Sequence, residues 1–216
     1  MTEQDSLITQ LFDNEDELTD KQKKIIIAAI DSFSEKGYAA TSTSEIAKKA
    51  GVAEGTIFRH YKTKKDLLLG IVAPTMAKLL APFVIKDLYK VLDTKYENFE
   101  DFLRAMIENR VVFAKKNLPL LKILIQEIPF HPELKDQFFE HIIKKVFDRY
   151  VKVTEHYQEK GQIIDIPPQQ VIRLTLTTIM GYLIGRYILF PNADWNDEDE
   201  IEATIQFLMR GLGITD

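Results

Sequence analysis

The polar side chains whose chemistry is easiest to interpret lie close together, between Thr56 and Lys64. At helical spacing, Thr56, Arg59 and His60 lie on the side away from Ile57. A guanidinium can bond a guanine edge through two parallel hydrogen bonds, and an imidazole can donate a hydrogen bond to a phosphate. Lys64 is placed at a helix N-terminus, where phosphate binds readily. These spacings predict contacts with nucleic acid.

Two short helices and a tight turn are expected to position these side chains. Ser42 and Glu45 have the spacing of a capping box, so the first helix is predicted to begin at about 41–43. Gly51 is placed to end that helix at positive φ. A second helix is predicted over about 53–61. This arrangement is the helix-turn-helix pattern.

The rest of the chain also has helical periodicity. A helix from Thr19 to about Lys36 is expected to support the pair from behind. A long helical pattern over 63–92 contains Pro74 and Pro82, which are expected to kink or break it. Further helices are predicted over 98–116, 119–128, 131–160 and 167–190, with a last one capped by Asp194 or Asn196. No segment alternates like a strand, so the sequence predicts an all-α fold of about nine helices.

Composition restricts the class of protein. The chain has 216 residues, of which 45% are hydrophobic and 28% charged, as in soluble globular proteins. It has no cysteine, which excludes disulfides and thiolate sites and suits a reducing compartment. The most apolar run, 171–190, is interrupted by Arg173 and Arg186, so we read it as a buried helix and not as a membrane span. We therefore expect a cytoplasmic protein that does not enter a membrane.

The net charge of −5 hides an uneven distribution. Residues 1–20 carry seven Asp or Glu and no Lys or Arg, whereas residues 21–70 carry ten Lys or Arg against five Asp or Glu. Local charge at the contact surface governs affinity for phosphate, so the acidic total does not argue against DNA binding.

The sequence contains no catalytic or metal-binding pattern. It has no Gly-rich phosphate loop, and none of its serines lies in a nucleophile elbow. The four histidines are not spaced with carboxylates as metal ligands. We therefore predict no enzymatic activity, no metal and no cofactor.

A longer set of residues resembles a known family. Gly37-Tyr38, Ile46-Ala47, Ala50-Gly51-Val52, Gly55-Thr56-Ile57-Phe58, His60-Tyr61 and Lys64 through Leu67 are similar to the DNA-binding signature of TetR-family transcriptional regulators. The resemblance covers roughly residues 22–71. It implies DNA contacts by Thr43, Glu54, Gly55, Thr56, Phe58, Arg59, His60 and Lys64. Ser44 can add a contact to the DNA backbone from the first short helix.

The chain departs from the family pattern at two positions. Ala53 replaces the Ser that caps the second short helix in many members, so this helix end is expected to lack a side-chain cap. Glu54 is acidic where a neutral or basic residue is common. It repels phosphate but can accept a hydrogen bond from a cytosine amino group.

The composition indicates an acidic leader (1–18), and the resemblance implies a helix-turn-helix domain (19–65) followed by a helical ligand-binding and dimerisation domain (66–216). Gly181 and Gly185 share a helix face with Thr177 and Thr178, and small residues allow two helices to approach closely. From the residues alone this face fits close packing inside one subunit equally well. TetR-like proteins pair through their last two helices, which favours a dimer contact.

A ligand pocket is expected in the body only by resemblance. Its candidate residues are apolar or aromatic, which suits a hydrophobic or amphipathic ligand, although a filled core would use the same residue types. The candidates are Phe83, Phe102, Met106, Ile125, Phe138, Ile142 and Tyr182.

Together these features predict a homodimeric repressor that a small molecule releases from a palindromic operator. The rival interpretation is a helical protein-interaction module that keeps the helix-turn-helix only as a packing unit. The acidic leader and the acidic total charge favour that rival, and salt-dependent binding to a palindromic duplex separates the two.

Overall fold

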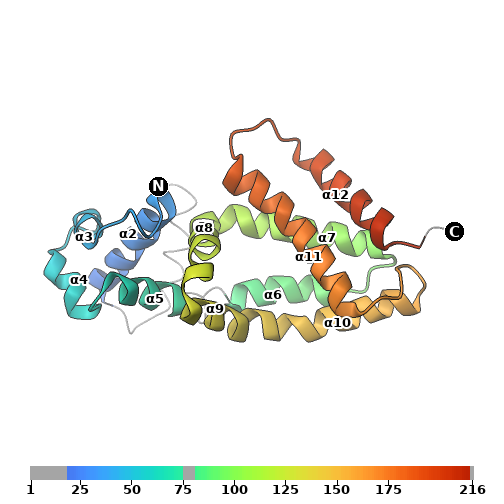
Figure 1. Ribbon diagram of the computed structural model, residues 1–216, viewed down its shortest axis with the longest axis horizontal. Helices are drawn as coiled ribbons and strands as arrows, with labels where there is room; N and C mark the ends of the chain where they lie inside the picture. The colour runs from blue at the N-terminus through green and yellow to red at the C-terminus, as the bar shows by residue number, and fades with distance from the viewer. Residues whose placement is uncertain (1–18, 75–80, 215–216) are drawn as a thin grey trace. The chain divides into compact units, whose positions relative to one another are not determined.

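The computed structural model describes residues 19–74 and 81–214, with the side chains of 71–84 and of residue 141 outside the description. The predicted acidic leader, 1–18, also lies outside it. Across the described residues the chain is predominantly helical (Figure 1), and its β-structure consists of one antiparallel bridge between Ile163 and Gly213. The predicted all-α fold is confirmed.

The described residues form eleven α-helices, where the sequence predicts about nine. The additional helices arise in two places. The predicted helix over 63–92 is present as two helices, one ending at Pro74 and the other starting at Ala81, and the predicted helix over 131–160 is interrupted by a π-helical turn. In chain order the helices are α2 (Asp20–Lys36), α3 (Thr43–Ala50), α4 (Glu54–His60), α5 (Lys64–Pro74), α6 (Ala81–Leu92), α7 (Phe99–Lys116), α8 (Leu118–Glu127), α9 (Pro132–Phe138), α10 (Lys144–Glu159), α11 (Pro168–Ile184) and α12 (Asp197–Leu212).

The described residues also contain three short helical turns. A 3-10 turn, η2 (Ile128–Phe130), follows α8. The π-helical turns η3 (Phe139–Ile143) and η4 (Gly185–Leu189) precede α10 and extend α11 respectively.

The chain divides into two compact units. The first unit comprises residues 1–82 and 116–141, and the second comprises 83–115 and 142–216. The first unit thus holds α8 and α9 in addition to the helices of the predicted DNA-binding head.

Apolar side chains of four helices form the core of the first unit. Phe33 of α2, Ile46 of α3, Ile57 of α4 and Leu67 of α5 are each at most 1% exposed. The capping box predicted at Thr19 is present, because Gln22 N–H donates to Thr19 Oγ1 and the Gln22 side chain accepts from Thr19 N–H. Local caps and one shared core therefore fix this unit.

An aromatic cluster lies in the core of the second unit. The ring centroids of Phe99 and Phe102 are 5.8 Å apart, and those of Phe102 and Tyr150 are also 5.8 Å apart. Tyr157 packs edge-on against Phe99 at 5.3 Å. These spacings are typical of favourable aromatic pairs, so α7 and α10 are held together by close packing.

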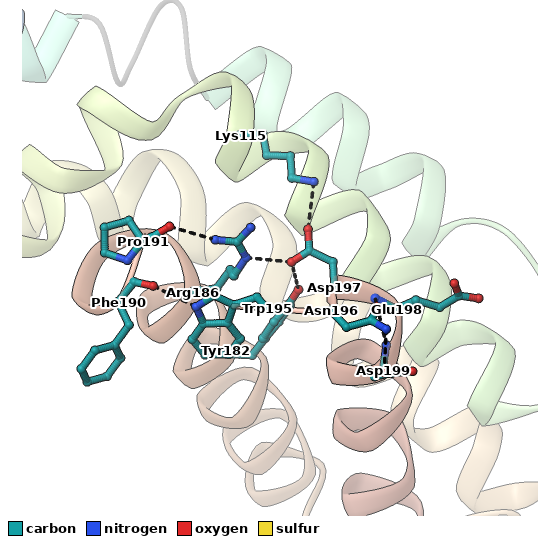
Figure 2. Close-up of polar contacts among 10 residues, drawn as sticks. All are labelled: Lys115, Tyr182, Arg186, Phe190, Pro191, Trp195, Asn196, Asp197, Glu198 and Asp199. Carbon is teal, nitrogen blue, oxygen red and sulfur yellow. Dashed lines mark hydrogen bonds and ion pairs between the residues drawn. The ribbon is translucent and has the colours of Figure 1, made fainter. Parts of the chain in front are cut away.

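A polar network fixes the turn between α11 and α12 (Figure 2). The Asp197 carboxylate accepts from Arg186 Nε at 2.8 Å and from Lys115 Nζ at 3.2 Å. Burial by itself raises the pKa of Asp197, but the hydrogen bonds from Arg186 and Lys115 outweigh it and leave this pKa below its ordinary value. Trp195 Nε1 donates to the Phe190 carbonyl at 2.8 Å.

Asp194 and Asn196 are the two predicted caps of the last helix, and Asn196 is the N-cap of α12. Its side-chain oxygen accepts from the backbone N–H groups of Glu198 and Asp199. The acidic first turn of α12 suits the positive end of the helix dipole. Local sequence therefore determines where this helix starts, and the Asp197 network attaches it to α11.

Candidate nucleic-acid interface

The predicted helix-turn-helix is formed by α3 and α4. Ser42 Oγ accepts from Glu45 N–H at 3.1 Å, which caps α3. Gly51 ends α3 in the left-handed region at φ 67°. The backbone N–H groups of Gly51 and Val52 bond the carbonyls of Lys48 and Ala47, the pattern of a Schellman motif. Only a residue without Cβ adopts this turn without strain, so Gly51 determines the angle at which α4 leaves α3.

Helix α4 turns one side into the core and presents the other to solvent. Ile57 is fully buried, whereas Gly55, Arg59 and His60 are exposed and Phe58 is 45% exposed. Thr56 is half-buried. Among the described residues, Arg59 and His60 take part in no hydrogen bond or ion pair, so their polar atoms are available to another molecule.

Ala53 at the start of α4 forms no side-chain cap, as predicted. Its backbone is extended, with φ −70° and ψ 143°, which is the geometry of an N-cap residue. The first N–H groups of α4 therefore lack the side-chain acceptor that Ser42 supplies to α3.

Two of the predicted DNA contacts are bonded to each other. Thr43 Oγ1 donates to Glu54 Oε1 at 2.7 Å, and both residues are half-buried. This bond links the first turn of α3 to the first turn of α4. Glu54 therefore has a structural partner that the sequence did not indicate, and binding a base would compete with it.

Lys64 also has internal partners. Its Nζ donates to the carbonyls of Tyr38 at 2.7 Å, Thr41 at 2.9 Å and Ala39 at 3.3 Å. The same ammonium lies 4.4 Å from the centroid of the Tyr38 ring. Three carbonyls and one aromatic face account for its donors, so Lys64 holds the loop after α2 against the start of α5.

Several other cations of the head are paired. Lys36 bonds Glu45 and thereby lowers the pKa of that carboxyl. Lys49 lies 3.5 Å from Asp31 and 3.4 Å from Glu35.

Besides Lys21 and Lys24 of α2, two lysines at the helix-turn-helix itself remain available for phosphate. Lys48 and Lys62 are exposed and form no hydrogen bond or ion pair within the described residues. Sequence reasoning counted both only as part of the charge and did not single them out. No local signal distinguishes them from Lys36, Lys49 or Lys64, because those three find their partners in other helices and loops.

The residues predicted for a ligand are distributed over both units. Phe102 and Met106 are 1% exposed, and Ile142 and Tyr182 are also buried, all in the second unit. Ile125 and Phe138 are half-buried in the first unit. The side chain of Phe83 lies outside the description.

The residues predicted for a dimer lie on α11 and at the start of η4. Thr177 and Gly181 are exposed, and Thr178 and Gly185 are half-buried. The hydroxyls of Thr177 and Thr178 donate back to the carbonyls of Arg173 and Leu174, each at 2.8 Å. Beyond its chain neighbours and the backbone of its own helix, a Cβ added at Gly181 would meet no atom within 4 Å.

The part of the chain that the structure describes offers neither a group of metal ligands nor a helix that could span a membrane. No three His, Cys, Asp or Glu side chains among the described residues are grouped to hold a metal ion. Of the described helices, none combines the length and apolar character that crossing a membrane requires.

Two helices joined by a Gly-centred turn, with an exposed polar face on the second, define a helix-turn-helix DNA-binding protein. Comparison with known proteins agrees. The profile of the bacterial regulatory proteins of the tetR family matches residues 25–71. The HTH-type transcriptional regulator YvkB of Bacillus subtilis, itself uncharacterized, is 47% identical over 200 residues, which is 88% of this chain and 96% of that protein. The chain belongs to the TetR family and is an HTH-type transcriptional regulator.

Solved structures share the fold. The TetR-family regulator PfmR of Thermus thermophilus superposes with a TM-score of 0.65 at 20% identity, covering 89% of this chain and 99% of that one. The regulator FadR of Bacillus subtilis, in complex with stearoyl-CoA, superposes with a TM-score of 0.64 at 20% identity, covering 87% and 97%.

Proposed function

We propose that the chain is a cytoplasmic, homodimeric repressor that binds a palindromic operator and is released by a small hydrophobic or amphipathic ligand. The observation that carries the DNA-binding part is the exposed face of α4, whose Arg59 and His60 form no hydrogen bond or ion pair among the described residues. A charged side chain left without partners on a recognition helix is available to read base edges.

The proposed contacts fall into two groups. Arg59, with Gly55, Thr56 and Phe58, faces the bases, and Gly55 allows the DNA to approach the helix closely. The phosphates are contacted by Ser44, His60, Lys48 and Lys62. Thr43, Glu54 and Lys64 stay as contacts expected from the family resemblance, although each already has a bond within the subunit.

Exposed apolar side chains on α11 and α12 support the proposed dimer. The two helices lie side by side (Figure 1). Phe207 on α12 is 68% exposed, and Leu174 and Met180 on α11 are 36% and 37% exposed. Pairing with a second copy would remove this surface from water, which favours association. In such a dimer, two α4 helices would occupy major grooves roughly 34–36 Å apart.

The ligand class is supported by composition and by likeness. The side chains expected to surround a pocket are aliphatic or aromatic, and the FadR structure of similar fold contains stearoyl-CoA, an amphipathic molecule. Release requires that the ligand bind the DNA-free conformation more tightly than the DNA-bound one.

The DNA-binding proposal can be tested without knowing the operator. Duplexes retained by the protein from a random pool would be sequenced, and the enriched duplex would then be titrated over a range of salt concentrations. We expect an inverted repeat and a steep linear fall of log affinity with log salt. Enrichment of no sequence, together with a flat salt dependence, would instead favour the protein-interaction module.

The release step has a separate test. Stearoyl-CoA and free stearate would be added to the preformed complex with the enriched duplex. A concentration-dependent loss of bound DNA is expected with at least one of them. Persistence of the complex with both would reject this ligand class and leave the DNA-binding part intact.

A further inference from the structure

A surface cavity of about 300 Å³ lies in the second unit, and none of the residues predicted for the effector lines it. One wall is the end of α6 and the following loop, Leu92 to Lys95. The other wall is one face of α10, where Arg149, Lys152, Val153, His156 and Tyr157 recur at helical spacing. Its volume lies at the lower end of the range for small-molecule sites.

The charge in this cavity is unbalanced. Lys95, Arg149 and Lys152 line it, with Asp93 as the one carboxylate of the lining. Arg149 Nε lies 3.3 Å from Asp93 Oδ1, so this carboxylate is already paired. Lys95 and Lys152 are exposed and form no hydrogen bond or ion pair among the described residues.

The Arg149 guanidinium is held in place by its neighbours, but one of its nitrogens has no hydrogen-bond partner. It lies over the Tyr89 ring, with Cζ 3.4 Å from the centroid, and the Tyr89 hydroxyl is itself fixed by donating to the Lys145 carbonyl at 2.9 Å. Nη1 of Arg149 is buried and has no hydrogen-bond partner. An unsatisfied guanidinium N–H is costly in a folded protein, and a nearby anion would offset this cost electrostatically.

Leu92, Val153 and Tyr157 form the apolar part of the lining. Leu92 is 5% exposed and Tyr157 is 2% exposed. The Tyr157 hydroxyl donates to the Tyr96 carbonyl at 3.3 Å, and its ring belongs to the aromatic cluster of the core. The cavity thus combines a fixed apolar base with a cationic rim.

A structural explanation for the cations would be that they neutralise the carbonyls at the C-terminus of α6. The hydrogen bonds to the last carbonyls of α6 do not support this explanation. Asp93 N–H bonds the Tyr89 carbonyl at 2.8 Å, and Thr94 Oγ1 bonds the Lys90 carbonyl at 2.5 Å. Neither Lys95 nor Lys152 donates to an α6 carbonyl.

We propose that this cavity binds a small organic phosphate, with Lys95, Lys152 and Arg149 around the phosphate and the ring or chain of the ligand against Leu92, Val153 and Tyr157. Three cations suit a doubly charged phosphate better than a singly charged carboxylate, because each additional charge interacts with all of them. The lining shares no residue with the predicted effector site, and the proposal does not depend on the proposed release mechanism.

The test uses the full chain and simple probes. Binding of phenyl phosphate, inorganic phosphate, benzoate and benzyl alcohol would be measured by calorimetry at low ionic strength. We expect phenyl phosphate to bind more tightly than inorganic phosphate or benzoate, and benzyl alcohol not to bind. Equal affinity for benzoate would overturn the assignment to phosphate, and no binding of any anion would overturn the site.

A charge-matched control separates a site from general attraction. The double variant Lys95→Gln, Lys152→Gln should weaken phenyl phosphate binding at least tenfold with an unchanged melting temperature. The double variant Lys86→Gln, Lys135→Gln removes the same two charges from exposed lysines outside the cavity lining and should leave binding unchanged. A similar loss in this control variant would show that the anion senses only overall charge.

Discussion

At the scale of single residues, two lysines of the head that are two positions apart have different environments. Lys64 donates to three carbonyls of the loop after α2, whereas Lys62 is exposed and unpartnered among the described residues. A cation that already satisfies internal acceptors contributes to stability. A cation without internal partners is free to neutralise a phosphate and release a counterion.

We predict that Lys64→Ala destabilises the protein, because it leaves three carbonyls without their charged donor. Hydrogen bonds to charged groups contribute about 1.5–3 kcal/mol, and urea unfolding should show a loss of that size. Lys62→Ala should leave the unfolding midpoint unchanged and reduce the slope of log affinity against log salt by about one. The opposite pattern, a stable Lys64 variant with the reduced slope, would assign the phosphate contact to Lys64.

Arg59 is predicted to carry sequence discrimination. A bidentate contact from a guanidinium to guanine discriminates by about 1–3 kcal/mol against the wrong base. Arg59→Ala should therefore lose more affinity for the selected duplex than for a scrambled duplex of equal length. His60→Ala should weaken both duplexes similarly. Equal losses in the Arg59 variant would make Arg59 a phosphate contact.

At the scale of elements, the ends of α4 and α12 show how local capping and tertiary bonds combine. Helix α12 has its Asn196 cap and the Asp197 network, whereas α4 begins at Ala53 without a side-chain cap. The Thr43–Glu54 bond attaches the uncapped start of α4 to α3. The start of α4 therefore depends on a neighbouring helix.

We predict that Ala53→Ser stabilises the head. The backbone at position 53 already has N-cap geometry, so a serine oxygen can accept an N–H of the first turn, worth about 0.5–2 kcal/mol. Thermal unfolding should show a higher midpoint. Ala40→Ser, at an exposed position outside any helix, is the matched control and should leave the midpoint unchanged. A lower midpoint for the Ala53 variant would mean that the added hydroxyl disturbs the turn.

The Asp197 network predicts a pH dependence. Because the pKa of Asp197 is lower in the folded protein, its contribution to stability is present above the ordinary value of 3.8 and is lost as pH falls through the folded pKa. Asp197→Asn should lower stability at neutral pH and flatten the fall of stability between roughly pH 5 and 3.

Asp148→Asn is the control for that titration, since Asp148 is exposed and has no ion pair among the described residues. It should leave stability at neutral pH unchanged. An equal effect of both substitutions would show that total charge, and not the bonds of Asp197, causes the acid sensitivity.

At the scale of the whole molecule, the exposed apolar faces of α11 and α12 are best explained by a second copy of the chain. Gly181 provides a direct test because a Cβ added there meets no atom within 4 Å beyond its chain neighbours and the backbone of its own helix. Leucine also has a higher helix propensity than glycine, so the isolated subunit should not be destabilised.

We therefore predict that Gly181→Leu weakens the dimer by about 1–3 kcal/mol, the usual cost of overpacking a tight contact. Sedimentation at several concentrations would measure the dimer dissociation constant, with thermal unfolding as the check on the subunit. An unchanged dissociation constant would place the dimer contact on a different face.

The sequence by itself determined the features that depend on neighbours three or four residues away. The caps at Thr19, Ser42 and Asn196, the end of α3 at Gly51 and the buried position of Ile57 all follow from local spacing. Such signals were sufficient for the all-α class, the helix-turn-helix and the family.

Only the tertiary structure decided which polar side chains remain free. Lys64 reaches the Tyr38 carbonyl across 26 residues, and Thr43 reaches Glu54 across 11. The basic cavity between α6 and α10 joins residues more than fifty positions apart. Separations of this kind are set by how helices pack, and the charge of a residue in the sequence does not indicate whether packing will bring it a partner.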